Sequence, residues 1–137
     1  MSHELCLCMN LRSAAQQLTR DYDAALAPAG ITANQFSLMN MIRTGDSPNV
    51  KELAEASGLD RSTLGRNLRV LEKQQLVSIL SGADARTREI RLTKHGRQAL
   101  RHATPLWHGV QDAFVARLGE EKRSQLKTLL TELTTEA

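Results

Sequence analysis

A predicted helix over residues 61–74 carries its leucines on one side and polar or basic residues on the other. The leucines share one sector of the helix surface, at about 100° per residue: Leu64, Leu68 and Leu71. The opposite sector, which we call the outer strip, holds Ser62, Arg66, Arg69 and Lys73. A helix of this kind buries its leucines and presents a cationic strip outward, as reading of the DNA major groove requires.

The positive charge of the chain is concentrated around this helix. The 137 residues carry a formal net charge of +3. Ten of the 18 Lys and Arg residues lie between Arg61 and Arg101, but only three of the 15 Asp and Glu residues do. Such asymmetry indicates an anionic partner for the middle of the chain. A solvated helix face is the alternative, and the coincidence of the charge with a helix pair and a basic hairpin favours nucleic acid.

The spacing of apolar residues predicts a mainly helical protein with one short β-hairpin. Helices are expected at 2–26, 32–43, 50–57 and 61–74, and strands at 77–80 and 89–92. A long helix is expected from 93, Gly119 interrupts the pattern, and a last helix carries Leu126, Leu129, Leu130 and Leu133 on one side. Thr32 and Asp60 are the expected N-caps of two of these helices, and Pro105 is a candidate kink. A short helix, a glycine turn, a longer helix and a hairpin follow the winged helix-turn-helix order.

Two segments resemble the MarR family of bacterial transcription regulators. They are LAEASGLDRSTLGRNLRVLEKQQLV from Leu53 and the wing pattern Asp84-Ala-Arg86, followed by Ile90-Arg-Leu92-Thr93-Lys-His-Gly96. The resemblance covers almost the whole chain. It implies an α+β fold, mainly α with a small β-hairpin, in a single domain over 1–137. Its expected parts are a winged helix-turn-helix DNA-binding lobe at 31–102 and dimerisation helices at 1–30 and 103–137.

The resemblance also implies which residues contact double-stranded DNA. Those expected to meet base edges and phosphates in the major groove are Ser62, Thr63, Arg66 and Arg69. Arg86 is expected to enter the minor groove, held in place by Asp84. Phosphate contacts are expected from Arg61, Asn67, Lys73 and Arg88. For Arg69 and Lys73, the competing interpretation is that they only solvate the helix.

A homodimer is expected, because winged helices of this kind read two half-sites of an inverted repeat. Apolar residues near both ends of the chain supply the expected dimer surface: Leu7, Leu11, Phe114, Leu118, Leu126, Leu129, Leu130 and Leu133. By the resemblance, the chain is expected to act as a repressor.

The resemblance implies release of such a repressor by a small ligand, often phenolic or aromatic, or by thiol oxidation. The candidate ligand-pocket residues are Tyr22, Met39, His102 and Trp107. The candidate redox residue is Cys6, which matches the reactive cysteine of the branch of the family that senses organic hydroperoxides. Asn10 and Arg20 occupy positions where tyrosines would support that thiol, so the sequence departs from that branch.

Other function classes find little support in the sequence. No phosphate-binding glycine loop, nucleophile elbow or zinc-hydrolase helix is present, so we expect no enzyme. Neither a cofactor nor a metal site is expected. The N-terminus does not resemble a secretory signal, no segment is apolar enough to span a membrane, and a cytoplasmic location fits best. A winged-helix module for protein contact, without DNA binding, is the remaining alternative.

Overall fold

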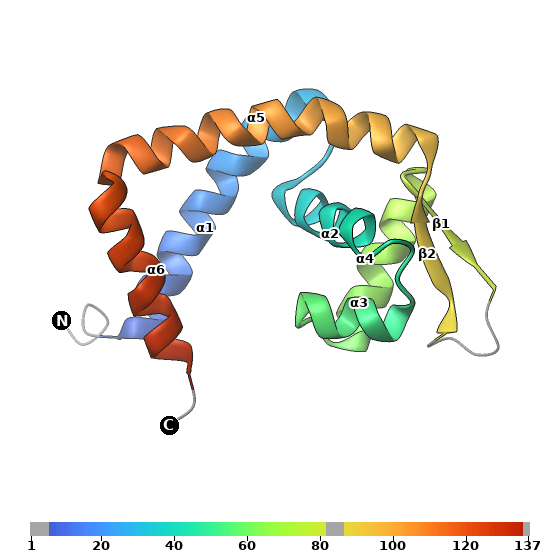
Figure 1. The fold of residues 1–137 in the computed structure, drawn as a ribbon, viewed down its shortest axis with the longest axis horizontal. Helices are drawn as coiled ribbons and strands as arrows, with labels where there is room; N and C mark the ends of the chain where they lie inside the picture. The colour runs from blue at the N-terminus through green and yellow to red at the C-terminus, as the bar shows by residue number, and fades with distance from the viewer. Residues whose placement is uncertain (1–5, 82–86, 136–137) are drawn as a thin grey trace.

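The computed structural model describes residues 6–81 and 87–135 as six α-helices, one short 3-10 helix and a two-stranded hairpin (Figure 1). The elements are α1 (Leu7–Leu26), η2 (Ala27–Ala29), α2 (Ala33–Thr44), α3 (Val50–Ser57), α4 (Arg61–Lys73), β1 (Val77–Leu80), β2 (Glu89–Leu92), α5 (Lys94–Leu118) and α6 (Glu120–Thr134). The expected mainly helical fold with one hairpin is confirmed. No helix in the described ranges is long and apolar enough to cross a membrane.

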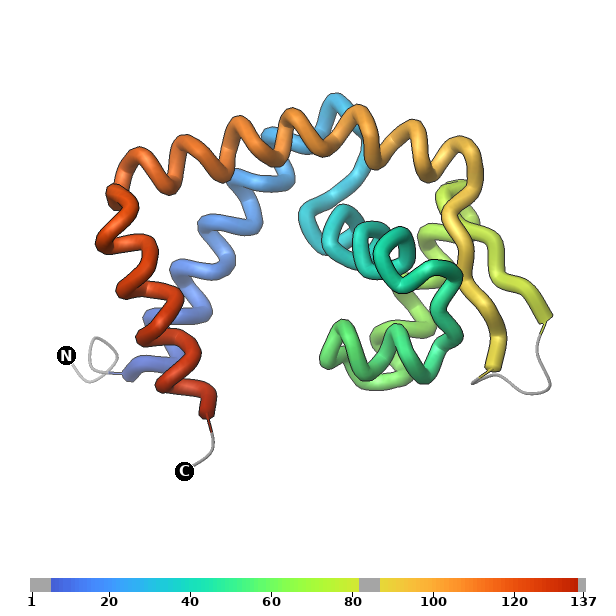
Figure 2. The backbone as a smooth tube through the Cα atoms, in the orientation of Figure 1, coloured from blue at the N-terminus to red at the C-terminus, as the bar shows by residue number. Residues whose placement is uncertain are grey.

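Helix α5 forms an arch that joins two parts of the molecule (Figures 1 and 2). At one end of the arch lie α1 and α6, which we call the terminal helices. Beneath the other end lie α2, α3, α4 and the hairpin, which we call the winged lobe. The arch stays helical on both sides of Pro105.

Side-chain caps fix where the helices of the winged lobe begin. Thr32 and Asn49 each start a helix with a capping box, in which the cap side chain and the side chain three residues on each accept a backbone N–H. Asp60 and Thr93 accept one such bond at the starts of α4 and α5. The predicted caps Thr32 and Asp60 are therefore confirmed.

The first helix begins later than the sequence predicts. It was expected from Ser2, but Cys6 has an extended backbone (φ −82°, ψ 106°) and α1 starts at Leu7. A first turn fixes several residues before it gains a hydrogen bond, and Cys6 supplies no side-chain cap. The helix therefore begins where the N–H of Asn10 reaches the carbonyl of Cys6, at 3.0 Å.

The hydrophobic core lies in the winged lobe, with α2 at its centre. This helix is apolar on more than one side, as predicted, and buries Phe36, Leu38, Met39 and Ile42. Helix α4 buries Leu64, Leu68 and Leu71. Among the described residues of the terminal helices, only Leu26 of α1 is buried and none of α6 is. The terminal helices therefore leave most of their apolar surface uncovered.

Four residues join the end of α4 to the start of α5, and we call them the clasp: Gln75, Leu76, Thr93 and Gly96. The N–H of Thr93 donates to the carbonyl of Leu76 at 3.0 Å. The Thr93 hydroxyl donates to the carbonyl of Gln75 at 2.6 Å and accepts from the N–H of Gly96 at 2.9 Å. Gly96 packs so closely that a Cβ atom there would lie 2.0 Å from the Leu76 oxygen.

Replacing Gly96 with alanine is therefore expected to destabilise the fold, because the new methyl group would collide with backbone. We expect the free energy of unfolding in urea to fall by about 1–3 kcal/mol or more. Gly109→Ala, in the same helix, is the matched control because nothing lies within 4 Å of a Cβ there. It should be neutral or stabilise by up to about 1 kcal/mol. Equal effects of the two changes would refute the close packing.

Candidate DNA-binding interface

The outer strip of α4 faces solvent in the structure. Ser62, Arg66, Arg69 and Lys73 are all exposed. On the opposite side Leu64 and Leu71 have no exposed surface and Leu68 has 3%. The predicted division of this helix into a buried and an outward face is confirmed. Among the described residues, no carboxylate lies within ion-pair distance of the three cations of the strip.

Hydrogen bonds at the start of α4 connect its cap to the outer strip. The Asp60 carboxylate accepts from the Thr63 N–H at 2.8 Å and from the Thr63 hydroxyl at 3.1 Å. The Arg66 guanidinium donates to the same hydroxyl oxygen at 3.4 Å. The bonds from Thr63, and then the charge of Arg66, hold the pKa of the Asp60 carboxyl below its ordinary value. Thr63 thus connects a charged cap to an arginine of the strip.

The turn before α4 sets the direction of that helix. Helix α3 ends at Gly58, whose left-handed conformation (φ 69°) reverses the chain with no steric penalty. The Ser57 hydroxyl oxygen then accepts from the N–H of Leu59 at 3.2 Å. Leu59 packs its half-buried side chain against the core. These contacts make the short helix, turn and longer helix of a helix-turn-helix.

The hairpin forms the wing beside this helix pair (Figure 1). Its strands pair antiparallel from Val77 opposite Leu92 to Leu80 opposite Glu89. The segment before α3 extends the sheet, because the N–H of Ile90 donates to the Pro48 carbonyl at 2.9 Å. Arg88 is exposed immediately before β2, at the loop end of the wing. The predicted wing contacts Asp84 and Arg86 lie outside the described residues.

The two other predicted phosphate contacts on α4, Arg61 and Asn67, differ in how far they are exposed. Arg61 is exposed at the first helical position. Asn67 is half-buried and lines a hollow beside the start of α2, with Thr32 and Gln35 among its neighbours. Sequence reasoning missed Val70, whose side chain is 49% exposed on α4. A valine outside the leucine sector was the signal that could have found it.

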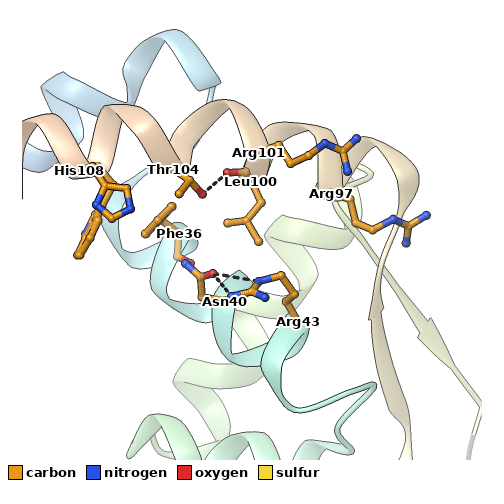
Figure 3. A pocket seen from close by; sticks show the side chains of 9 residues that line it. Phe36, Asn40, Arg43, Arg97, Leu100, Arg101, Thr104 and His108 are labelled. Atoms are coloured by element: carbon orange, nitrogen blue, oxygen red, sulfur yellow. Dashed lines mark hydrogen bonds between the residues drawn. The ribbon is translucent and has the colours of Figure 1, made fainter.

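Two adjoining cavities, each of about 500 Å³, open beside α2 on the winged lobe. One lies between α2 and α5 (Figure 3), and the other is bounded by α1, α2 and Trp107 of α5. Four residues line both: Phe36, Asn40, Arg43 and Trp107. Two of the predicted pocket residues are here, since Trp107 lines both cavities and Tyr22 lines the second. The Tyr22 hydroxyl donates to the Gln111 side chain, and burial raises its pKa.

The structure does not bring the other two predicted pocket residues to these cavities. Met39 has no exposed surface, lies in the core and lines neither cavity. His102 is exposed on α5 and lines neither cavity. Both placements correct the prediction, because sequence spacing did not indicate the depth of Met39 or which side of α5 meets α2. The lining missed by sequence reasoning follows helical spacing along α2 at Phe36, Asn40 and Arg43.

The two cysteines lie at the start of α1. Cys6 is half-buried at the N-cap position and Cys8 is exposed in the first turn. Cys6 precedes α1, so only Cys8 lies within the helix. Both are free thiols.

Comparison with known proteins identifies the group to which the chain is related. Residues 29–87, which include the helix-turn-helix and the first strand of the wing, match the sequence profile of the MarR family. The chain is also 43% identical to the transcriptional regulator MosR of M. tuberculosis, in a crystal structure with DNA that superposes with a TM-score of 0.80. That match covers 90% of this chain and 92% of MosR. The chain belongs to the MarR family.

Two further relatives are transcription regulators, in agreement with this assignment. A helix-turn-helix regulator of Bacillus cereus is 33% identical over 75% of this chain and 69% of its own length. HosA of Escherichia coli, another transcriptional regulator, is 29% identical over 90% of both chains. These relatives are regulators and not enzymes, as predicted. The chain is therefore a DNA-binding transcription regulator of the MarR family with a winged helix.

The depressed pKa of Asp60 predicts how the start of α4 responds to acid. A carboxylate with a lowered folded-state pKa contributes stability above the unfolded-state pKa and loses it as pH falls through the folded-state value. We expect wild type to resist urea better than Asp60→Asn at neutral pH, because asparagine caps without charge. The difference should shrink below about pH 4. A difference that stays constant between neutral pH and pH 3 would contradict this role of the charge.

Proposed function

We propose that the chain acts as a dimeric repressor that places two α4 helices on an inverted-repeat operator and is released by a small aromatic ligand. The observation that carries the DNA-binding part is the outer strip of α4. Its cations are exposed and have no carboxylate partner among the described residues. Exposed cations on a projecting helix suit phosphate and base contacts, and arginine can bond guanine in a bidentate manner.

The proposed DNA contacts are those that the family resemblance implies. Ser62, Thr63, Arg66 and Arg69 are assigned to the major groove, and Lys73 and Arg61 to phosphates. Asn67 is assigned a phosphate contact at the edge of the helix. Arg88 and, outside the described residues, Asp84 and Arg86 are assigned to the wing contact. MosR, at 43% identity, has been solved in complex with DNA, which supports use of this surface.

Removing the Arg66 side chain is expected to reduce sequence discrimination. In Arg66→Ala, preference for the operator over a single-base variant should fall by about 1–3 kcal/mol at one position of each half-site. Fluorescence anisotropy with a DNA fragment from upstream of the chain's own gene and its point variants measures this. Arg123→Ala on α6 is the control and should leave the preference unchanged. Equal preference in wild type and Arg66→Ala would sink the base-contact assignment.

The proposed dimer uses residues 1–30 and 103–137, which include the terminal helices and the second half of α5, and leaves 31–102 to contact DNA. Large apolar side chains on α1, on α6 and at the end of α5 are exposed: Leu7, Met9, Leu11, Leu18, Leu118, Leu126, Leu129, Leu130 and Leu133. An apolar surface of this extent is unusual on a monomer and marks an interface. Since α6 buries no residue in its own chain, its leucine stripe is free to pack against a second copy.

Placing charge on that stripe is expected to prevent dimer formation. Leu129 and Leu133 are 60% and 50% exposed, so the double variant Leu129→Asp/Leu133→Asp should not disturb the core of the monomer. Sedimentation velocity should show wild type as a dimer and the variant as a folded monomer with much weaker operator binding. Thr128→Asp, on the opposite side of α6, is the matched control and should remain a dimer. A variant that remains a dimer would overturn this interface.

The proposed ligand site is the pair of cavities beside α2. Tyr22 and Trp107 supply aromatic surface there, and Asn40 supplies a polar group. Cavities of this size accept drug-sized molecules. A protein with the same fold, the transcriptional repressor CouR, has been solved bound to p-coumaroyl-CoA (24% identity, TM-score 0.86, 98% of this chain and 96% of CouR). Because both cavities are bounded by α2 and α5, a ligand there would bias how the winged lobe sits under α5.

Oxidation of Cys6 is a second candidate switch. The observation in its favour is that Cys6 is half-buried before α1 and Cys8 is exposed, so both thiols are open to oxidants. If this switch operates, peroxide should release wild type from its operator and leave Cys6→Ser bound in the same anisotropy assay. Cys8→Ser is the matched control. Peroxide release that persists in Cys6→Ser would remove this candidate.

A further inference from the structure

Thr63, in the first turn of α4, bonds differently from other threonines in the helices. Several of those donate the hydroxyl to the carbonyl four residues before them: Thr19, Thr44, Thr104, Thr131 and Thr134. Thr63 instead donates its hydroxyl to one oxygen of the Asp60 carboxylate at 3.1 Å, and its N–H to the other oxygen at 2.8 Å. A helical threonine otherwise divides between two rotamers, so these two bonds favour one of them.

The directions of the bonds around Thr63 follow from the groups that make them. A carboxylate only accepts hydrogen bonds and a guanidinium only donates them. The single hydroxyl proton of Thr63 therefore goes to Asp60, and the lone pairs of the same oxygen remain for Arg66, whose Nη2 donates to it at 3.4 Å. Bonds thus run from Arg66 to Thr63 and from Thr63 to Asp60.

This arrangement occupies both donors of Thr63. Its N–H and its hydroxyl proton are each bonded to the Asp60 carboxylate. A phosphate oxygen, or an acceptor on a base edge, needs a donor from the protein. While the bonds to Asp60 persist, Thr63 has no proton to give to such a group.

Arg66 is the side chain that gains from this arrangement. It is exposed, and its bond to Thr63 is the only side-chain hydrogen bond that the outer strip makes with the described residues. An arginine side chain has many rotamers, and immobilising it on a partner costs free energy. The bond restrains Arg66 before DNA binds. It also directs the guanidinium toward the start of α4, the end of a recognition helix that contacts base edges.

We infer that Thr63 contributes to base recognition by positioning Arg66 and not by a contact of its own, and that Asp60 is the group that orients the Thr63 hydroxyl for this purpose. Thr63 and Asp60 are therefore positioning residues. The inference rests on the proposed base contact of Arg66, and it refines the assignment of Thr63 to the major groove.

The readout that isolates this role is preference between DNA sequences, not overall affinity. The Asp60 carboxylate repels phosphates of any sequence, so its removal strengthens binding to all DNA alike. Positioning of Arg66 instead affects the ratio of affinities for the operator and for its single-base variants. The base pair to examine is the one at which Arg66→Ala loses preference.

Thr63→Val keeps the shape of the side chain and removes the hydroxyl. We expect preference at the Arg66 base pair to fall by about two- to tenfold, because Arg66 is then immobilised only on binding. Thr63→Ser retains the hydroxyl and should retain the preference. Thr131→Val on α6, whose hydroxyl bonds only to the Lys127 carbonyl, is the matched control and should behave as wild type. Fluorescence anisotropy on the operator fragment and its point variants measures each ratio.

Asp60→Asn separates positioning from capping. The new amide oxygen can still accept the N–H of Thr63, so the helix cap is kept. Its NH2 group would donate to the Thr63 oxygen, where the carboxylate accepted, and so would take a lone pair that Arg66 uses. Preference at the Arg66 base pair should therefore fall as in Thr63→Val, even though binding to all DNA strengthens. This variant also keeps the test decisive if Thr63→Val folds poorly.

Combining Thr63→Val with Arg66→Ala decides whether Thr63 acts through Arg66. The double variant should show the same preferences as Arg66→Ala alone, because the threonine then has nothing to position. A further loss in the double variant, at that base pair or at another, would show a direct contact of Thr63 and overturn the inference.

Two other results separate the inference from the proposed function. If Arg66→Ala loses preference but Thr63→Val and Asp60→Asn both keep it, the base contact stands and the positioning role is overturned. If Arg66→Ala itself keeps full preference, the proposed base contact is refuted, and the inference with it.

Discussion

Burial of three leucines of α4 is the constraint on which the rest of the winged lobe depends. Leu64, Leu68 and Leu71 have at most 3% of their surface exposed, and α2 lies at the centre of the core they join. Fixing this face inward fixes the opposite face outward, because an α-helix is rigid about its axis. Removing one such leucine would cost roughly 2–5 kcal/mol. The orientation of the outer strip toward solvent is thus a consequence of core packing, not of its own contacts.

Helix α5 connects the winged lobe to the terminal helices. At its start the clasp ties Thr93 to the loop after α4 by bonds to Leu76 and Gln75. Midway it forms one wall of the cavities beside α2, and at its far end it leads into α6. A ligand between α2 and α5 would therefore act on the same rigid element that holds the end of α4. In a dimer, a small rotation of each winged lobe about α5 would change the spacing of the two α4 helices.

Local chemistry made much of this architecture predictable from the sequence. The caps Thr32 and Asp60, the hairpin strands and the two faces of α4 follow from spacing over a few residues. The cavity between α2 and α5 could not be predicted from such spacing. Its walls come from Phe36–Arg43 and from Arg97–His108, which only tertiary packing brings together. Met39 was misassigned for the same reason: an apolar residue next to a cavity and one in the core look alike along the chain. The start of α1 was misjudged because apolar periodicity does not locate the residue at which a helix begins, and Cys6 is extended.

The central claim is that two copies of this chain place two outer strips one DNA turn apart. Hydroxyl-radical footprinting of the operator fragment, with the stoichiometry measured on the same complex, tests it most directly. Two protected regions separated by about 10–10.5 base pairs, roughly 34 Å, with two chains bound per operator, are the predicted result. A single protected region, or one chain per operator, would contradict the account. The uncovered apolar surface of the terminal helices would then not be a dimer interface on the operator.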